Sequence, residues 1–196
     1  LGESLKRYDF NIKPFLRDLF LNSAEFYTLK ALRSLPKSPA YFVVSALRLL
    51  QVPEPNGEAA LTPLADMGQQ LFQPPDVFGW PGGADWFSSN RLLARMNWAN
   101  TTVISRSPST GIQFTKVLNQ AGLTAGATPE QVVDYFTALL IQRPLPQSIR
   151  QTLVEYMLKM DNGQLSPNFA LNNITIDKKV RGLIHLLLSR PEAQVF

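Results

Sequence analysis

Few residues of this sequence combine the types and spacing that catalysis requires. The one histidine, His185, would need a nucleophile to act on, and no GxSxG, HExxH, P-loop or EF-hand pattern occurs. Asp76 and Asp85 lie nine positions apart, and paired carboxylates can perform acid–base chemistry or bind a hard cation. An aspartate in a loop rich in proline and glycine more often caps a turn. The sequence therefore predicts no catalytic residue, no metal site and no cofactor.

Both aspartates belong to the segment Gln73–Phe87, which reads QPPDVFGWPGGADWF. Its prolines cannot donate backbone hydrogen bonds and end the preceding helix, and its glycines allow positive φ or close approach of another segment. Such a loop cannot be held by a ladder of backbone bonds, so side chains must anchor it. The expected structural residues are Pro74, Pro75, Gly79, Gly82 and Gly83, and the side chains available as anchors are Val77, Phe78, Trp80, Trp86 and Phe87.

The two tryptophans of the loop have two interpretations. Trp80 and Trp86 are either the buried core of the loop or rings that face a groove and stack on a ligand such as a sugar. A buried ring would make Trp80→Ala destabilising by about 3–5 kcal/mol. Two largely buried rings with no adjoining pocket would remove the support for a ligand site at the loop.

The helix expected after the loop carries two arginines and a third tryptophan. An apolar spacing predicts its inner face at Leu92, Met96, Ala99 and Val103. Arg95 is expected to reach back and donate to loop carbonyls, or to Asp76 or Asp85, because the prolines leave those carbonyls short of partners. Anion binding by Arg95 is the alternative. The candidate ligand- or partner-contact residues are Trp80, Asp85, Trp86, Arg91, Arg95 and Trp98, the last on an exposed stripe.

Helical periodicity dominates the remaining sequence. Helix starts are marked by Ser38-Pro39, by Thr62-Pro63 and by Thr128-Pro129, where Gln131 completes a capping box. Asn173–Asp177 is the one stretch that could be extended. Helices are expected at about 12–22, 39–51, 63–72, 89–105, 110–121, 129–142, 147–160 and 177–189. The predicted fold is all-α, one irregular domain over residues 1–196 with about eight helices and a loop rich in Pro, Gly and Trp.

Composition excludes several classes of protein. Hydrophobic residues make up 45% and charged residues 17% of the 196, which indicates a packed domain rather than a disordered chain. The net charge is +4, but the basic residues are scattered, so we expect no nucleic-acid footprint. The absence of cysteine excludes disulfides, thiolate catalysis and cysteine-ligated zinc. No apolar run reaches the length of about 18 residues that a membrane span needs.

The loop and the helix after it also carry a long motif. Its residues are Gly68-Gln69, Leu71-Phe72, Pro74-Pro75, Val77, Gly79-Trp80, Gly82-Gly83 and Trp86, then Leu92-Leu93, Arg95 and Asn97. This arrangement resembles the bacterial domain-of-unknown-function family 1800 (DUF1800), whose pattern is GQxLFxPPxVxGWxGGxxW followed by LLxRxNF. Lys37-Ser38-Pro39 and Leu187–Glu192 resemble two further blocks, so the resemblance covers nearly the whole chain. Tyr41 and Trp98 depart from it, since the family usually has Glu and Phe there.

The resemblance implies a protein without an established activity. It implies export to the periplasm or the outside of a bacterial cell, and a partner in a sulfatase-like protein. It also implies that residues 1–196 are the C-terminal half of a longer chain, with the N-terminal half as a partner. Two functions follow as expectations. The first is a helical interaction or scaffold module, and the alternative is an enzyme or glycan-binding domain with a site at the Trp80–Trp86 loop.

Overall fold

The computed structural model describes residues 2–22, 35–54, 57–166 and 168–196, which fall into two compact units. The smaller unit is Leu1–Pro36 with Val195–Phe196, and the larger is Lys37–Gln194. The expectation of one domain over the whole chain stays a prediction. None of the helices in these described ranges has the length and apolar character needed to cross a bilayer.

The described part of the smaller unit includes two short helices joined by a turn. It contains α1 (Gly2–Arg7) and α2 (Ile12–Asn22), and neither helix has a buried residue. The turn between them uses positive φ at Asp9 and Phe10. The ring of Tyr8 contacts that of Phe15, with centroids 6.4 Å apart. Helix α2 confirms the expected helix at 12–22, whereas α1 was not predicted.

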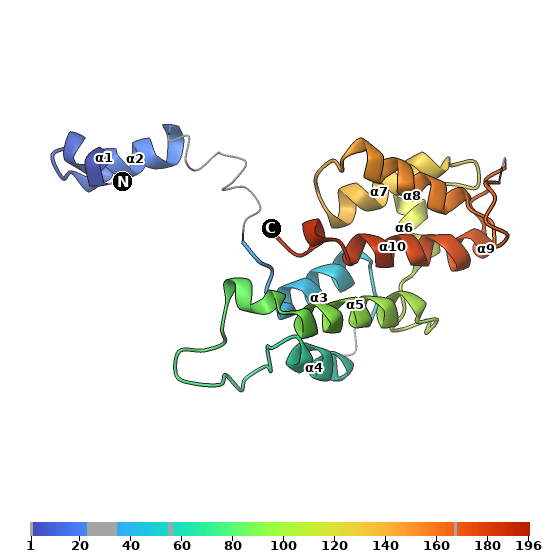
Figure 1. The fold of residues 1–196 in the computed structure, drawn as a ribbon, viewed down its shortest axis with the longest axis horizontal. Helices are drawn as coiled ribbons and strands as arrows, with labels where there is room; N and C mark the ends of the chain where they lie inside the picture. The colour runs from blue at the N-terminus through green and yellow to red at the C-terminus, as the bar shows by residue number, and fades with distance from the viewer. Residues whose placement is uncertain (1, 23–34, 55–56, 167) are drawn as a thin grey trace. The chain divides into compact units, whose positions relative to one another are not determined.

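The larger unit is built from helices joined by short turns and one long loop (Figure 1). Its elements are α3 (Pro39–Leu49), α4 (Gly57–Asp66), the 3₁₀ turn η2 (Gly83–Phe87), α5 (Ser89–Ile104), α6 (Phe114–Gln120), α7 (Pro129–Leu140), α8 (Gln147–Leu158), α9 (Asn173–Thr175), the π-helical turn η3 (Ile176–Val180), α10 (Arg181–Leu188) and the 3₁₀ turn η4 (Pro191–Ala193). Among the described residues, extended pairing is limited to isolated bridges, so the all-α class is confirmed.

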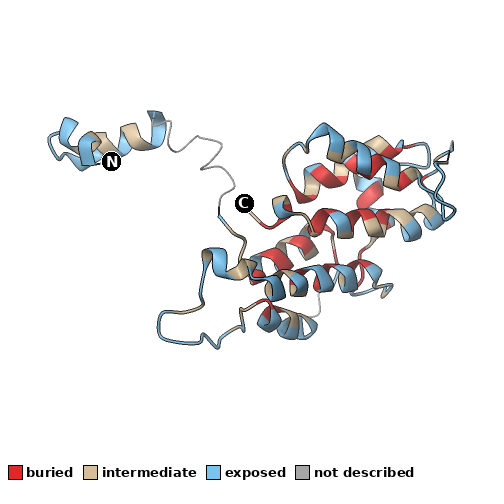
Figure 2. Ribbon diagram, viewed as in Figure 1, coloured by how far each residue is buried: buried red, intermediate tan, exposed pale blue. Residues whose placement is uncertain are grey.

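Helix α10 forms the centre of this unit. It packs against α5, α7 and α8, and Leu183, Ile184 and Leu187 are fully buried in those contacts. Figure 2 shows the buried residues along α10 and on the inner sides of the helices around it. Burial of these side chains, at about 1.5–3 kcal/mol each, is the main force that holds the helices together.

Two predicted helix starts are formed by the expected caps. The Ser38 hydroxyl accepts from Tyr41 N at 3.2 Å at the start of α3. At α7, Thr128 Oγ1 accepts from Gln131 N, and the Gln131 side chain accepts in return from Thr128 N at 2.8 Å. This capping box satisfies two amides that have no partner within the helix.

The sequence prediction was wrong at two other places. Helix α4 begins at Gly57 rather than at Pro63, which lies inside it. The helix-forming residues Glu58–Leu61 extend it toward the N-terminus despite the cost of an interior proline. The stretch 173–177 is helical rather than extended, because the Asn172 side chain caps it by accepting from Thr175 N at 2.9 Å. Helix α9, the π-helical turn η3 and helix α10 follow one another without a break, from Asn173 to Leu188.

Candidate functional site

The long loop leaves the end of α4 and returns to the start of α5 (Figure 1). A tight turn fixes its tip: the Asp76 carboxylate accepts from Phe78 N at 2.8 Å, and the Asp76 carbonyl accepts from Gly79 N at 3.2 Å. Gly79 has φ +94°, which a residue with a side chain rarely adopts. Asp76 therefore has the turn-capping role expected from its place in the loop.

The tip of the loop displays apolar side chains instead of burying them. Phe72, Val77 and Phe78 are 95%, 93% and 94% exposed. Val77 and Phe78 were expected among the anchors of the loop, and this prediction was wrong because the Asp76 turn directs them away from the helices. Phe72 has φ +59°, a strained value for a residue with a side chain.

The two loop tryptophans are half-buried. They are neither the fully buried core of the loop nor fully exposed rings. Trp80 Nε1 donates to the Gln70 carbonyl at 2.9 Å, and this hydrogen bond joins the second half of the loop to its beginning. Trp86, in η2, has its indole nitrogen sealed from solvent without a partner. Neither ring lines any of four pockets found among the described residues.

We expect Trp80→Ala to destabilise the protein by about 1 kcal/mol, the scale of one hydrogen bond and a half-buried ring. This replaces the loss of about 3–5 kcal/mol that full burial would give. Urea unfolding of the wild type, Trp80→Ala and Trp80→Phe would measure it. A loss for Trp80→Ala as large as that of a core aromatic would show that the ring is a buried anchor after all.

Arg91 closes the base of the loop. Its guanidinium donates to the Asp85 carbonyl and lies directly over Gly68, where an added Cβ would be 2.6 Å from Arg91 Nε. Gly68 also has φ +91°, a backbone conformation that favours glycine, and an added Cβ would force the Arg91 side chain to shift. The latch that the sequence assigned to Arg95 is thus formed by Arg91, one turn earlier on α5.

Arg95 makes different contacts from those predicted, because it lies on the inner face of α5 and is only 1% exposed. Its Nη2 donates to the Lys37 carbonyl at 2.8 Å, and its Nη1 donates to Gln194 Oε1 at 3.1 Å. The guanidinium also lies over the rings of Phe42 and Phe87, at 5.1 and 5.8 Å from their centroids. It contacts no loop carbonyl and neither Asp76 nor Asp85, so the predicted partners were wrong.

The surroundings of Arg95 also argue against the anion-binding alternative. No carboxylate of the described residues forms a salt bridge with it. Burial without a counter-charge lowers the pKa of Arg95 to about 10, so the guanidinium is still charged at neutral pH. Its Nη atoms donate within the fold and its unpartnered Nε is sealed from solvent, so an anion from solution would find no accessible donor.

Trp98 was predicted on an exposed stripe and is instead 7% exposed. Its ring packs edge-on against Phe42, with centroids 5.4 Å apart. The inner face of α5 is Arg95, Trp98, Ala99 and Val103, whereas Met96 points outward. The sequence prediction placed Met96 instead of Arg95 on the inner face of α5, because it treated Arg95 as a surface residue.

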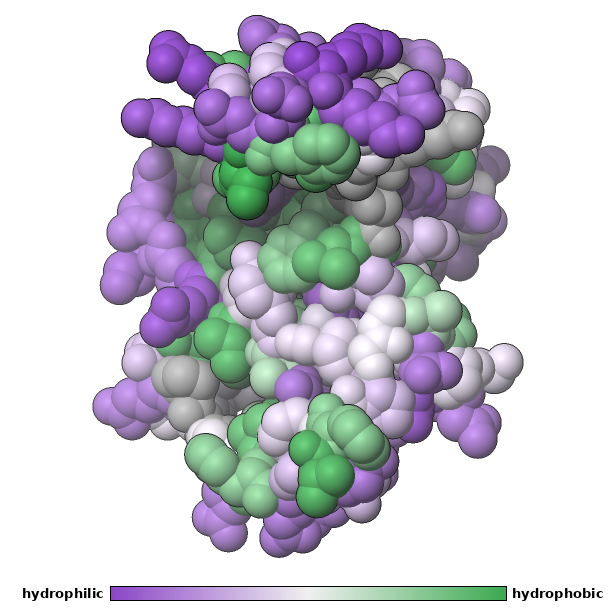
Figure 3. Space-filling view, turned by 90° about the vertical axis from the view of Figure 1, so that its left-hand side faces the viewer, coloured by the Kyte–Doolittle hydropathy of each residue, from purple (hydrophilic) through white to green (hydrophobic). Residues whose placement is uncertain are grey.

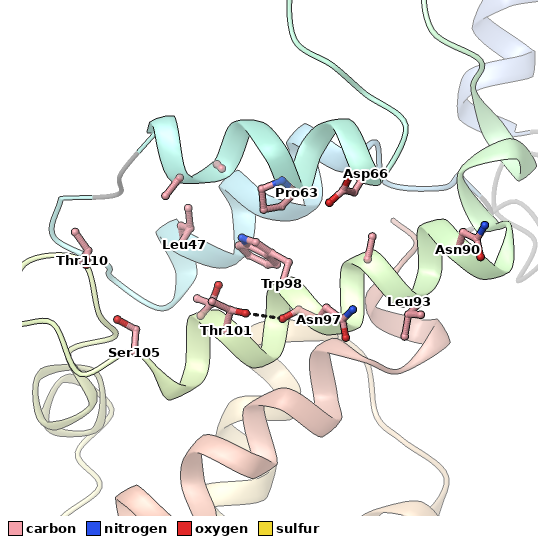
Figure 4. A pocket seen from close by; sticks show the side chains of 14 residues that line it. Leu47, Pro63, Asp66, Asn90, Leu93, Asn97, Trp98, Thr101, Ser105 and Thr110 are labelled. Carbon is pink, nitrogen blue, oxygen red and sulfur yellow. Dashed lines mark hydrogen bonds between the residues drawn. The ribbon is translucent and has the colours of Figure 1, made fainter.

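A groove of about 610 Å³ lies over Trp98, between α4 and α5 (Figure 4). This volume is within the range of small-ligand sites, roughly 300–1,000 Å³. Its apolar walls include Leu47 and Pro63, and its polar groups include Asp66, Asn90 and Asn97. Sequence reasoning did not single out these residues, because it placed Trp98 on an exposed stripe of α5 rather than beneath α4.

The other candidate residues are dispersed. His185 is half-buried on α10 with Nδ1 unpartnered, and Asp85 is exposed in η2. Within the described residues, no group of three or more His, Cys, Asp or Glu side chains could hold a metal ion. The structure brings Arg91 and Asp85 together at the base of the loop, and it separates both from Arg95 and Trp98, which face the core.

The fold and these sites define an irregular all-α protein with a displayed apolar loop and a groove between two helices. The chain belongs to the family described as protein of unknown function (DUF1800), whose family model matches residues 1–195. The match confirms the family resemblance. Neither a curated protein nor a solved structure matches the chain.

Proposed function

We propose that this protein is a helical interaction module that binds a partner protein through the segment Phe72–Phe78, the display loop. The observation that carries the proposal is the near-complete exposure of Phe72, Val77 and Phe78. Figure 3 shows apolar side chains gathered at the lower end of the molecular face where this loop lies. Large apolar side chains grouped in this way are typical of protein-binding sites.

The construction of the loop supports a binding role. The Asp76 turn, the Trp80–Gln70 bond and the Arg91 latch hold the display loop from within and from its base. A surface fixed before binding loses less conformational entropy when a partner docks. Burying each of the three side chains in a partner would contribute about 1.5–3 kcal/mol.

The partner that we propose first is an upstream half of the longer family chains, with a sulfatase-like protein as the second candidate. Both come from the family resemblance, as does a location in the periplasm or outside a bacterial cell, which cell fractionation would check. Either partner would present an apolar groove, since the tip of the loop offers no charged group besides Asp76. The Trp80–Trp86 loop as a glycan or catalytic site has less support, because no pocket described above adjoins the rings.

The test compares two triple variants. Phe72→Ser, Val77→Ser and Phe78→Ser together should leave the free energy of unfolding within about 0.5 kcal/mol per site, because the side chains contact almost nothing. The same variant should weaken binding to the separately expressed upstream half by about a hundredfold or more, measured by calorimetry. The matched control replaces Ile104, Leu165 and Ile174, which are also exposed, by serine.

The second arm of the experiment uses the sulfatase-like protein in place of the upstream half. If only the sulfatase-like protein binds, and the display-loop variant loses that binding, the docking role is supported and the sulfatase-like protein is the partner. Failure of both proteins to bind, or equal loss in the control variant, would overturn the proposal.

A further inference from the structure

The groove between α4 and α5 is lined by residues outside the display loop. One side of α5 faces it continuously, since the residues from Asn90 to Ser105 that line it recur every three or four positions. At 1.5 Å per residue this face is roughly 22 Å long. The opposite wall is α4, where Ala59, Ala60 and Pro63 are small enough to leave the space between the helices open.

The indole N–H of Trp98 is the feature that points to a ligand. The side chain is more than nine-tenths buried, and it projects from α5 into the groove with its nitrogen on the side of Leu47 (Figure 4). No described residue accepts a hydrogen bond from it, and unlike the indole nitrogen of Trp86 it is not sealed from solvent. The N–H therefore meets water in the groove, and an acceptor on a ligand placed there would take the place of that water.

The polar rim of the groove offers further unused hydrogen-bonding groups. The side chains of Asp66, Asn90 and Asn97 line it and bond no other described side chain. Figure 4 shows Asp66 pointing from α4 toward α5. The amides both donate and accept, and the carboxylate accepts, so together they suit a ligand with many hydroxyl groups.

Charge and shape exclude other classes of ligand. Among the described residues that line the groove, Asp66 alone is charged, so an anionic ligand would be repelled and would meet no cation there. The common modes of peptide recognition need a free sheet edge, a continuous apolar groove, an aromatic-lined track or an arginine cluster. The groove has one indole edge, and its apolar residues, among them Leu47 and Leu93, are interrupted by polar residues along α5 and by Asp66 on α4.

We propose that the groove between α4 and α5 binds a neutral saccharide of two or three sugar units, which accepts a hydrogen bond from Trp98 Nε1 and donates to Asp66. The apolar patches of the sugar rings would lie against Pro63 and Ala94, and the hydroxyl groups would meet Asn90 and Asn97. This site uses a buried indole edge, and it is independent of the partner-binding loop.

Proton NMR of the indole N–H groups gives a direct test, with maltotriose, cellotriose and chitotriose as probes. At least one trisaccharide should shift the Trp98 indole resonance, which is assigned by its absence in Trp98→Phe. Trp98→Phe keeps an aromatic ring beside Phe42 and removes the smaller ring of the indole together with its N–H donor, so binding should weaken about tenfold or more, at least as much as for the loss of one hydrogen bond.

Asn97→Ala should weaken binding to a similar extent. Because Asn97 is exposed, this substitution should leave the packing of the core unchanged. The matched control is Asn100→Ala, an exposed asparagine on the same helix that does not line the groove, and it should bind normally. The Phe72, Val77 and Phe78 variant should also bind the saccharide normally, which separates this proposal from partner docking.

Three results would overturn the assignment. They are no shift of the Trp98 resonance with any trisaccharide at millimolar concentration, equal binding by Asn97→Ala and Asn100→Ala, and tighter binding of trialanine amide than of every saccharide. The last result would identify the groove as a peptide site.

Discussion

Arg95→Ala is expected to destabilise the protein by about 3–5 kcal/mol. The substitution removes a fully buried side chain and leaves the Lys37 carbonyl and Gln194 Oε1 without their donor. Lys37 and Gln194 are the first and last residues of the larger unit in the sequence. A backbone hydrogen bond from Lys37 N to the Gln194 carbonyl, at 2.8 Å, already joins them in space. Arg95 therefore fastens both ends of this unit to α5, and its loss should loosen the start of α3 and the end of the chain together.

Urea unfolding followed by circular dichroism would measure the effect of Arg95→Ala. Arg95→Lys should recover only part of the loss, because an ammonium cannot hold the planar, two-sided arrangement between Phe42 and Phe87. Gln194→Ala and the double variant complete a cycle in which the two losses should not add. The control, Arg48→Ala on the exposed side of α3, should change stability by less than about 0.5 kcal/mol. A loss below about 1 kcal/mol for Arg95→Ala would contradict this role.

Gly182→Ala is expected to cost about 1–3 kcal/mol, although the same change in an open helix stabilises by about 1 kcal/mol. Gly182 lies in α10 where the Tyr156 side chain of α8 crosses it. A Cβ at this position would be 1.9 Å from the Tyr156 hydroxyl oxygen and 3.0 Å from Tyr156 Cζ. The ring or the helix must then move, in a core that packs with few voids.

The partner substitution Tyr156→Phe tests the cause of that loss. It removes the closest atom and leaves the ring carbon, so it should rescue part but not all of the stability of Gly182→Ala. Gly57→Ala is the matched control, since Gly57 is also in a helix and an added Cβ there meets nothing within 4 Å. The measurement is thermal unfolding of Gly182→Ala, Tyr156→Phe, the double variant and Gly57→Ala. Equal midpoints for Gly182→Ala and Gly57→Ala would show that the Tyr156 side chain moves aside without a cost in stability.

The fold class and most helices could be predicted from the order of residues alone. Amphipathic spacing is a local property, and caps such as Thr128 with Gln131 act within one turn, so both can be recognised without tertiary information. The prolines and glycines of the loop likewise determined that residues 73–82 would form neither helix nor strand. The family followed from the length of the motif around that loop.

The side of α5 that faces inward depends on contacts with residues distant in the sequence. The spacing allows either a face with Leu92 and Met96 or a face with Arg95 and Trp98, and hydrophobicity alone favours the first. Burial of Arg95 becomes favourable because acceptors from Lys37 and Gln194, far away in the sequence, meet it inside the fold. That rotation brings Trp98 under α4 and creates the groove.

The display loop shows the same division between local and tertiary information. Its composition predicted an irregular segment that needs anchors, and Trp80 is one of them. Which apolar side chains anchor the loop and which reach solvent depends on the Asp76 turn and on where Arg91 finds room over Gly68. Those choices rest on contacts between segments that the order of residues does not reveal, because an aromatic residue has the same hydrophobicity whether the fold offers it a pocket or leaves it in water.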